Sequence, residues 1–299
     1  MASPITSITD EALIAFDTLT DRASNLIQPT LRLGVTGLSR AGKTVFITAL
    51  VHNLLHGGRL PMFEAAHSGR LARSFLDAQP DDAVPRFQYE DHAARMLSER
   101  IWPDSTRAIS ELRLVIEYES ASGWNRFFSG GRLNLDIVDY PGEWLLDLPL
   151  LGQDYAEFSL NAASLARSPV RHDLAAPWLE KAGTIDPHKQ ADEGDARELA
   201  RLFTDYLRAC KREERALSTL PPGRFLMPGD LDGSPALTFA PLPNLPDGAA
   251  PRGSLMAMMQ RRYESYKQVV VKPFFREHVA RLDRQIVLID AMQAMNAGR

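Results

Sequence analysis

The 299-residue chain has a single cysteine, no excess of basic residues and no long apolar run. One thiol, Cys210, excludes an intramolecular disulfide and fits a reducing compartment. With 34 basic against 38 acidic residues, the net charge is −4, so the composition predicts no nucleic-acid partner. No apolar run approaches the roughly 18 residues of a membrane-spanning helix, and residues 1–10 lack a secretory-signal pattern. We therefore predict a cytoplasmic protein, with peripheral membrane contact left open.

The composition is that of a globular protein, with 44% apolar and 24% charged residues. Apolar periodicity in the first half predicts an amphipathic helix over residues 9–27, a strand over 31–36, helices over 43–55 and 91–101, and an antiparallel hairpin of strands 110–120 and 132–139. In the second hairpin strand, Leu133, Leu135 and Ile137 alternate with polar residues, which is typical of a sheet with one apolar face.

After residue 151 the pattern becomes mainly helical. One helical face includes Phe203, Leu207 and Cys210, so the cysteine is predicted to be a core residue rather than a reactive thiol. Residues 221–253 contain eight prolines and five glycines and predict a long ordered loop or linker rather than a helix or strand. A helix over 255–284 should kink or divide at Pro273. The apolar run 286–290 predicts a strand buried on both faces of a parallel sheet.

The chemistry-bearing motif lies between the first strand and the next helix. Residues 37–44 read G-L-S-R-A-G-K-T and match the phosphate-binding loop G-x-x-x-x-G-K-[ST]. Gly37 and Gly42 allow a tight turn, so that backbone N–H groups and the helix N-terminus face phosphates. Lys43 would neutralise the β- and γ-phosphates and Thr44 would ligate Mg²⁺. The predicted nucleotide-binding residues are Gly37, Ser39, Arg40, Ala41, Gly42, Lys43, Thr44, Val45 and Gly142.

A second motif, Asp139-Tyr140-Pro141-Gly142-Glu143, ends the predicted hairpin. Asp139 would hold Mg²⁺ through water, and the Gly142 N–H would bond the γ-phosphate and release when it leaves. A plain turn is the alternative, since proline and glycine favour turns. The segment before the hairpin contains Thr106, predicted to complete the Mg²⁺ shell, with Ser105 as the alternative residue and an ordinary helix-ending loop as the alternative interpretation.

With these motifs in this order, the chain resembles the translation-factor and Ras-type P-loop GTPases. A narrower resemblance, to the YcjX family of bacterial stress-associated ATPase/GTPase proteins, rests on G-L-S-R-A-G-K-T-V-F-I-T-A-L at 37–50 and D-Y-P-G-E-W-L-L-D-L-P-L-L at 139–151. It extends in order to residues 286–298. The resemblance implies an α/β fold with a three-layer αβα P-loop NTPase core of the Ras/TRAFAC type, interrupted by a large, mainly helical insertion.

The expected organisation is an N-terminal helical segment (1–30), the P-loop core with both switch regions (31–151), the helical insertion (152–284) and a return to a core strand (285–299). Members of the family are longer than this chain, and the guanine-reading motif N/T-K-x-D does not occur in it. We therefore expect the chain to be C-terminally incomplete. Binding of GTP/GDP with Mg²⁺, in preference to ATP/ADP, is implied by the resemblance alone.

The catalytic candidates are Lys43, Arg40 and Glu143. The loop resembles G-L-Y-R-T-G-K-S of guanylate-binding proteins, in which the arginine acts as a finger supplied in cis, so Arg40 would stabilise transition-state charge. Pairing with a surface acid is the alternative. Glu143 stands where many GTPases carry a water-orienting glutamine; a carboxylate beside the γ-phosphate is electrostatically unfavourable, so slow intrinsic hydrolysis is expected.

The preferred interpretation is a Mg²⁺-dependent regulatory GTPase. The alternatives are a P-loop ATPase or kinase, which an adenine preference or phosphate transfer would favour, and a nucleotide-binding module without turnover, which tight diphosphate binding alone would favour. The insertion directly follows the γ-phosphate sensor, so it is a candidate surface for a protein effector. Homodimer formation is left open.

Overall fold

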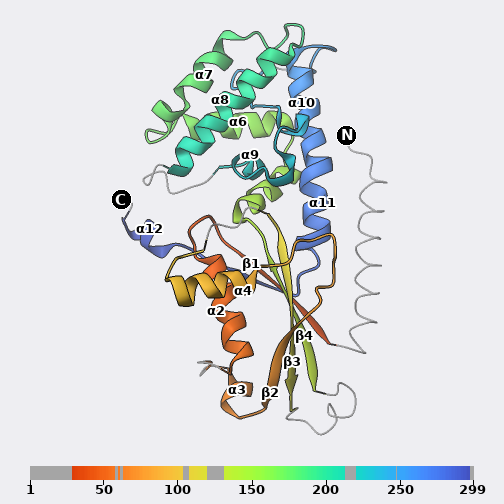
Figure 1. Cartoon of the computed structure of the whole chain (residues 1–299). Coiled ribbons are helices and arrows are strands. Elements are labelled where there is room, and N and C mark those ends of the chain that lie inside the picture. Colours follow the sequence, from red (N-terminus) through yellow and green to blue (C-terminus); the bar gives the residue numbers. More distant parts are fainter. Residues whose placement is uncertain are drawn as a thin grey trace. The chain divides into compact units, whose positions relative to one another are not determined.

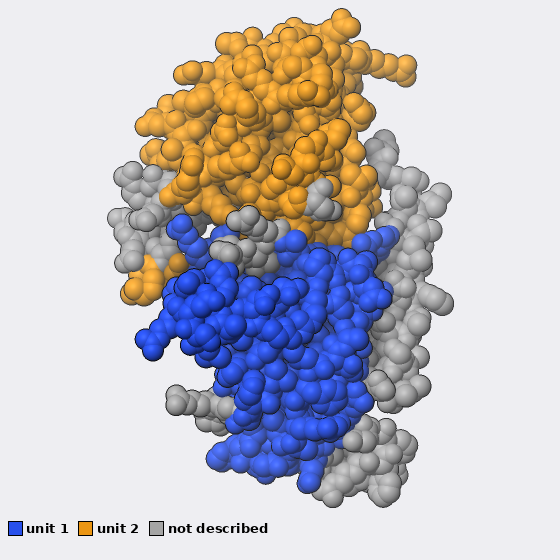
Figure 2. Space-filling model, in the orientation of Figure 1, with its two compact units in different colours: residues 1–141, 276–289 blue, residues 142–275, 290–299 orange. Residues whose placement is uncertain are grey.

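The computed structural model describes residues 29–57, 60, 63–103, 108–119, 131–212, 220–246 and 248–296. The helix predicted over 9–27 lies outside this part of the chain. Two compact units are distinguished, shown in different colours in Figure 2. The first comprises Met1–Pro141 and Arg276–Ile289, and the second comprises Gly142–Phe275 and Asp290–Arg299. The boundary at Pro141 differs from the predicted one at residue 151, because residues 142–152 pack within the second unit.

The first unit contains a five-stranded mixed sheet of order β2-β3-β4-β1-β5. Its strands are β1 (Thr30–Thr36), β2 (Leu71–Asp77), β3 (Ser110–Tyr118), β4 (Arg132–Asp139) and β5 (Arg284–Val287). Strand β1 pairs in parallel with β4 and β5, whereas β3 pairs antiparallel with β2 and β4. The predicted antiparallel hairpin is therefore confirmed, and the chain has an α/β fold.

Helices of the first unit cover the apolar face of this sheet (Figure 1). Helices α2 (Lys43–Leu55) and α4 (Tyr89–Ala94) contribute buried residues to this face, whereas α3 (Glu64–His67) and the π-helical turn η1 (Arg95–Glu99) bury none. Ile47 and Val51 of α2 pack with Leu114 of β3 and Ile137 of β4 in one buried cluster. Helix α2 has the predicted bounds, since its apolar residues recur at helical spacing and Gly57, with φ 62°, follows its end.

Alternate positions of the same strands carry charge pairs. Arg113 of β3 binds Asp136 of β4 through two hydrogen bonds of 2.6 and 2.7 Å. Arg32 of β1 binds Glu111 of β3 at 2.5 Å. Burial raises the pKa of Glu111 above its ordinary value, although the positive charge of Arg32 opposes this shift. Buried pairs of this kind lose much of their Coulomb energy to desolvation. We therefore expect them to add little to the free energy of unfolding and to favour the observed strand pairing.

The prediction for the last strand was wrong in one respect. Strand β5 runs parallel to β1 as expected, but it is not buried on both faces: Val287 and, beyond the strand, Ile289 are exposed by 55% and 78%. Among the described residues β5 has no strand on its other side, so it forms a sheet edge. An apolar run alone does not distinguish an edge strand from a central one.

The second unit is mainly helical. Its elements are the 3₁₀-helix η2 (Gly142–Gly152), α6 (Tyr155–Ala166), α7 (His172–Thr184), α8 (Glu193–Arg212), α9 (Gly223–Leu226), η4 (Gly229–Leu231), η5 (Pro235–Leu237), α10 (Leu255–Tyr266), η6 (Lys267–Val271), α11 (Lys272–Phe274) and α12 (Ala291–Asn296). The π-helical turn η7 (Phe275–Val279) follows α11 and continues into the first unit. Pro273 lies in α11, between the π-helical turns η6 and η7. The long helix is therefore divided near this proline, as predicted.

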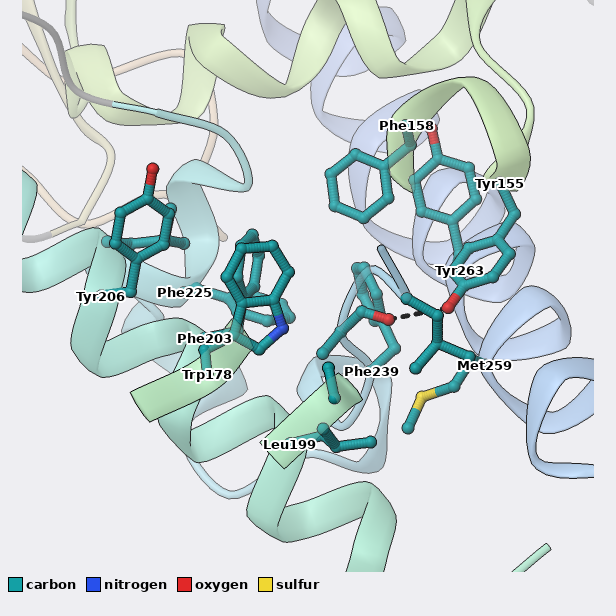
Figure 3. Packing of buried hydrophobic residues seen from close by; sticks show 14 of the residues in the cluster. Tyr155, Phe158, Trp178, Leu199, Phe203, Tyr206, Phe225, Phe239, Met259 and Tyr263 are labelled. Atoms are coloured by element: carbon teal, nitrogen blue, oxygen red, sulfur yellow. Dashed lines mark hydrogen bonds between the residues drawn. The ribbon is translucent and has the colours of Figure 1, made fainter. Parts of the chain in front are cut away.

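Aromatic side chains dominate the core of the second unit (Figure 3). Phe158 stacks on Tyr263 with ring centroids 4.9 Å apart, and Trp178 stacks on Tyr206 at 5.6 Å. Cys210 is buried in the same cluster, as predicted. The described part of the proline-rich segment contributes Phe225 and Phe239 to this core, so it is not a linker, and it contains the short helices α9, η4 and η5, which the sequence did not predict. No helix in the part of the chain described is long and apolar enough to cross a membrane.

Candidate nucleotide-binding site

The glycine-rich segment 37–44 links the end of β1 to the start of α2 in the first unit. Gly42 is the N-cap residue of α2 in the left-handed conformation, with φ 87°, and it supplies no side-chain cap. The first turn of α2 contains no acidic residue. This helix end therefore presents backbone N–H groups and a partial positive charge to an incoming anion.

Two residues of the loop have backbone conformations that restrict their identity. Gly37 has φ 151°, and a Cβ there would lie 2.4 Å from the carbonyl oxygen of Leu288. Leu288 in turn donates its N–H to Thr36 at 2.8 Å, so the chain leaving β5 passes directly over the loop. Arg40 has φ 74°, in a region that side chains other than glycine rarely adopt. The arginine at this position is therefore held in a strained backbone conformation.

Lys43 is already directed into the loop. Its ammonium group donates a hydrogen bond of 2.8 Å to the carbonyl oxygen of Gly37, and the residue is only 6% exposed. Thr44 is 8% exposed and begins the same helix, where its carbonyl oxygen accepts the hydroxyl of Thr48 at 2.7 Å. Both residues of the motif therefore lie in the first turn of α2, and both line the cavity described next.

A cavity of about 600 Å³ opens over this helix start. Of the predicted binding residues, Arg40, Ala41, Gly42, Lys43, Thr44 and Val45 line it. Phe46, Trp102, Pro103 and Leu288 also line it and were not predicted. The indole of Trp102 is 73% exposed. Trp102 and Pro103 stand just before the predicted threonine in the sequence, but only the structure shows that they line a cavity. The cavity volume lies within the range of small-molecule sites.

Asp139 lies at the C-terminal end of β4, next to the C-terminal end of β1 from which the loop begins. It is the last residue of β4 and pairs in parallel register with Val35, next to the end of β1. Its side chain is buried, as is that of the neighbouring Tyr140, whose hydroxyl bonds the Gln285 amide. Burial raises the pKa of Tyr140. In the first unit, the loop residues and Asp139 therefore lie at the C-terminal ends of two neighbouring parallel strands.

The hydroxyl of Thr44 and the carboxylate of Asp139 could hold Mg²⁺ only together with the phosphate groups of a bound nucleotide. The described residues contain no group of three or more His, Cys, Asp or Glu that could hold a metal ion. One hydroxyl and one carboxylate are what Mg²⁺ needs when phosphate oxygens and water complete its shell. Thr44, which lines the cavity, and Asp139, which ends β4, supply one group of each kind. Thr106 and Ser105, the predicted further ligand and its alternative, lie outside the described residues.

Gly142 and Glu143 belong to the second unit, where they begin η2. Glu143 is 1% exposed, and its carboxylate accepts a 2.7 Å bond from Lys211 at the end of α8. Trp144 donates to the carbonyl oxygen of Met227 at 2.8 Å, and the Arg224 guanidinium lies 3.2 Å from its ring centroid. Glu143 and Trp144, which directly follow the D-x-P-G turn, are therefore held by residues of the second unit. The sequence did not predict these contacts.

Asp147 is a buried carboxylate in the same segment. It accepts hydrogen bonds from the Tyr266 hydroxyl at 2.6 Å and from the Gly223 and Arg224 N–H groups at 2.7 and 3.3 Å. Burial raises its pKa from 3.8 to about 6, although these hydrogen bonds oppose the shift. Its contribution to folding is thus fully present below pH 3.8 and is lost as the pH rises through about 6.

We expect Asp147→Asn to remove this pH dependence. Relative to the parent protein, the variant should gain about 2 kcal/mol of unfolding free energy between pH 4 and pH 7, because the parent loses stability as its buried carboxyl ionises. Urea denaturation at several pH values, followed by tryptophan fluorescence, measures the difference. A constant difference between the two proteins across this range would mean that Asp147 ionises normally.

These features define an α/β protein whose first strand leads into a phosphate-loop sequence, with a mainly helical second unit. The model of the YcjX-like family, DUF463, matches residues 31–299, and the chain belongs to this family. It is 42% identical over 279 residues to "Ras-like GTPase YcjX" of Escherichia coli strain K12, covering 90% of this chain and 59% of that protein. It is 36% identical over 313 residues to "Ras-like GTPase YcjX" of Shewanella oneidensis, covering 96% of this chain and 64% of that protein. The chain thus spans less than two thirds of either relative.

Proposed function

We propose that this chain binds and hydrolyses a nucleoside triphosphate with Mg²⁺, as a regulatory GTPase with slow intrinsic turnover built on a P-loop NTPase core. The observation that carries the proposal is the placement of Lys43 and Thr44 at the start of α2, facing a cavity of about 600 Å³. A triphosphate would accept N–H bonds from residues 40–44, while the Lys43 ammonium offsets the charge of its β- and γ-phosphates.

Each polar group of the predicted site has a role in this proposal. Thr44 and Asp139 would hold Mg²⁺, which when bound neutralises phosphate charge. Gly142 would donate its N–H to the γ-phosphate, so that loss of this phosphate releases the turn. Arg40 would supply a positive charge from within the loop. Cytoplasmic location and an effector bound through the helical unit are part of the same proposal.

Guanine is proposed as the base because the two relatives are named Ras-like GTPase. Titration of the full chain with fluorescent GDP and with fluorescent ADP, both with Mg²⁺, tests this choice. We expect GDP to bind at least about tenfold more tightly, equivalent to about 1.4 kcal/mol. A preference for ADP would favour the ATPase alternative. Binding of neither nucleotide would contradict the proposed function, and tight binding without turnover would favour a non-hydrolysing module.

A further inference from the structure

A second groove lies wholly within the second unit and shares no residue with the cavity at the phosphate loop. It has a volume of about 500 Å³ and lies between one face of α8 and residues 225–238 (Figure 1). Every residue that lines it belongs to the second unit. The groove is therefore complete within this unit.

Three arginines of α8 line one wall of this groove. The side chains of Arg197, Arg201 and Arg208 are 74%, 62% and 54% exposed. Spacings of four and seven residues place them on one face of the helix. At 1.5 Å of rise per residue, Arg197 and Arg201 are about 6 Å apart along the helix axis, and Arg208 lies about 10 Å further on. Their charges therefore form a row along the groove.

The opposite wall is mostly apolar. It includes Pro228, Pro235 and Leu237, and Phe225 of α9 also lines the groove. Asp232 is the acidic residue that this wall contributes among the lining residues. The groove thus offers positive charge on the α8 side and apolar contact on the other side.

One carboxylate is shared between two of the three arginines. Asp205 of α8 lies 3.1 Å from Arg201 and 3.5 Å from Arg208, and its side chain is 50% exposed. Each guanidinium has five N–H donors, so a single carboxylate cannot use all the donors of both. Exposed ion pairs of this kind contribute little to stability, so a competing carboxylate can displace Asp205 at little cost.

A second carboxylate at the groove is shared in the same way. Glu193 lies 3.4 Å from Arg197, and it is also bound by Arg262, whose side chain is 12% exposed. Arg262 donates a further hydrogen bond of 3.0 Å to the carbonyl oxygen of Thr238, which lines the groove. The more buried arginine therefore holds Glu193, and the exposed Arg197 is the easier of the two to recruit to a ligand.

We propose that this groove binds an acidic segment of a partner protein in an extended conformation. Its carboxylates would accept charge-assisted hydrogen bonds from the arginines of α8. Alternate side chains of an extended chain point to opposite sides and repeat about every 6.6 Å, close to the spacing of Arg197 and Arg201. The intervening side chains would be apolar and would pack on Pro235 and Leu237.

This inference rests on the part of the proposed function that places an effector on the helical unit, and it gives that effector a site and a chemistry. It does not rest on nucleotide binding. A narrow groove with one apolar wall favours a peptide over a flat anionic membrane surface, which could not enter it.

The test titrates a fluorescein-labelled peptide, Glu-Leu-Glu-Leu-Glu-Leu-Glu, with the full chain and follows fluorescence anisotropy. Such a peptide spans about 23 Å when extended, enough to pass all three arginines. We expect saturable binding that weakens as salt is added. The same peptide with glutamine in place of glutamate should bind at least about tenfold more weakly, because it lacks the charges.

Two variants should change the affinity in opposite directions. Arg201→Gln combined with Arg208→Gln should weaken binding of the glutamate peptide at least about tenfold, because two cationic donors are lost. Asp205→Asn should strengthen it by about threefold, because it removes the carboxylate that competes for both arginines. All three side chains are at least half exposed, so the variants should fold, and thermal unfolding checks this.

Arg212→Gln is the matched control. Arg212 is an exposed arginine of the same helix, but it does not line the groove. Its substitution removes the same charge from α8, so any effect of net charge alone would appear here as well. Peptide affinity should stay within about twofold of the parent value.

Equal binding of the glutamate and glutamine peptides, or binding that survives in the double arginine variant, would overturn the proposed site. Absence of peptide binding would overturn it too. Binding to phosphatidylserine vesicles that only the double variant loses, without peptide binding, would instead identify an anionic membrane surface as the ligand. A chain that binds GDP but not the peptide would leave the proposed nucleotide function intact, and a chain that binds the peptide but not GDP would contradict that function and support the groove.

Discussion

Lys43→Ala should weaken the binding of fluorescent GDP by about 100-fold. A hydrogen bond to a charged group contributes about 1.5–3 kcal/mol, and in this position the lysine also neutralises phosphate charge. In the structure the Lys43 ammonium is 2.8 Å from the Gly37 carbonyl oxygen, so it needs little rearrangement to reach a bound phosphate. The loss should therefore appear in affinity for the diphosphate as well as for the triphosphate.

Thr48→Val is the matched control for this variant. Thr48 lies on the same helix, is 3% exposed and bonds the Thr44 carbonyl oxygen, but it does not line the cavity. Its substitution perturbs the start of α2 without removing a phosphate-binding group, so affinity should change by less than about threefold. Thermal unfolding of both variants separates loss of binding from loss of fold. Unchanged GDP binding by folded Lys43→Ala would contradict a phosphate-binding role for the loop.

Arg40→Gly should lower GTP hydrolysis by about 10³-fold while making the first unit slightly more stable. The rate should fall because an arginine finger supplies about 10³–10⁵ of the rate where it operates. The stability should rise by about 1 kcal/mol because Arg40 has φ 74°, a conformation that glycine adopts without strain. Single-turnover hydrolysis and urea denaturation measure the two effects independently.

Arg40→Ala separates the side chain from the backbone. Alanine also lacks the guanidinium, so hydrolysis should fall as far as in Arg40→Gly, but the strained backbone remains and stability should not rise. Both variants should be measured over a range of protein concentrations, because the finger would operate only in an assembled state if a second copy were required. Unchanged hydrolysis by Arg40→Ala at every concentration would leave the alternative, a surface ion pair.

The elements that could be predicted from sequence are those whose determinants lie close together in the chain. Helix α2 was predicted with its observed bounds, because apolar residues recur at helical spacing along its 13 residues and a glycine lies near each end. The hairpin of β3 and β4 was predicted from the alternation of apolar and polar residues along most of each strand. Strand β2 was missed: its segment, L-A-R-S-F-L-D, does not alternate, and only its long-range pairing with β3 defines it.

The same distinction separates the parts of the candidate site. The sequence by itself determined a loop with Lys43 and Thr44 at a helix start, because the steric demands of Gly42 and the hydrogen bonds of one helical turn extend over only a few residues. Only the tertiary structure decided that Trp102 lines the cavity and that Lys211 binds Glu143. Those contacts join residues tens of positions apart, and the burial that brings them together depends on the packing of whole helices, which no local pattern encodes.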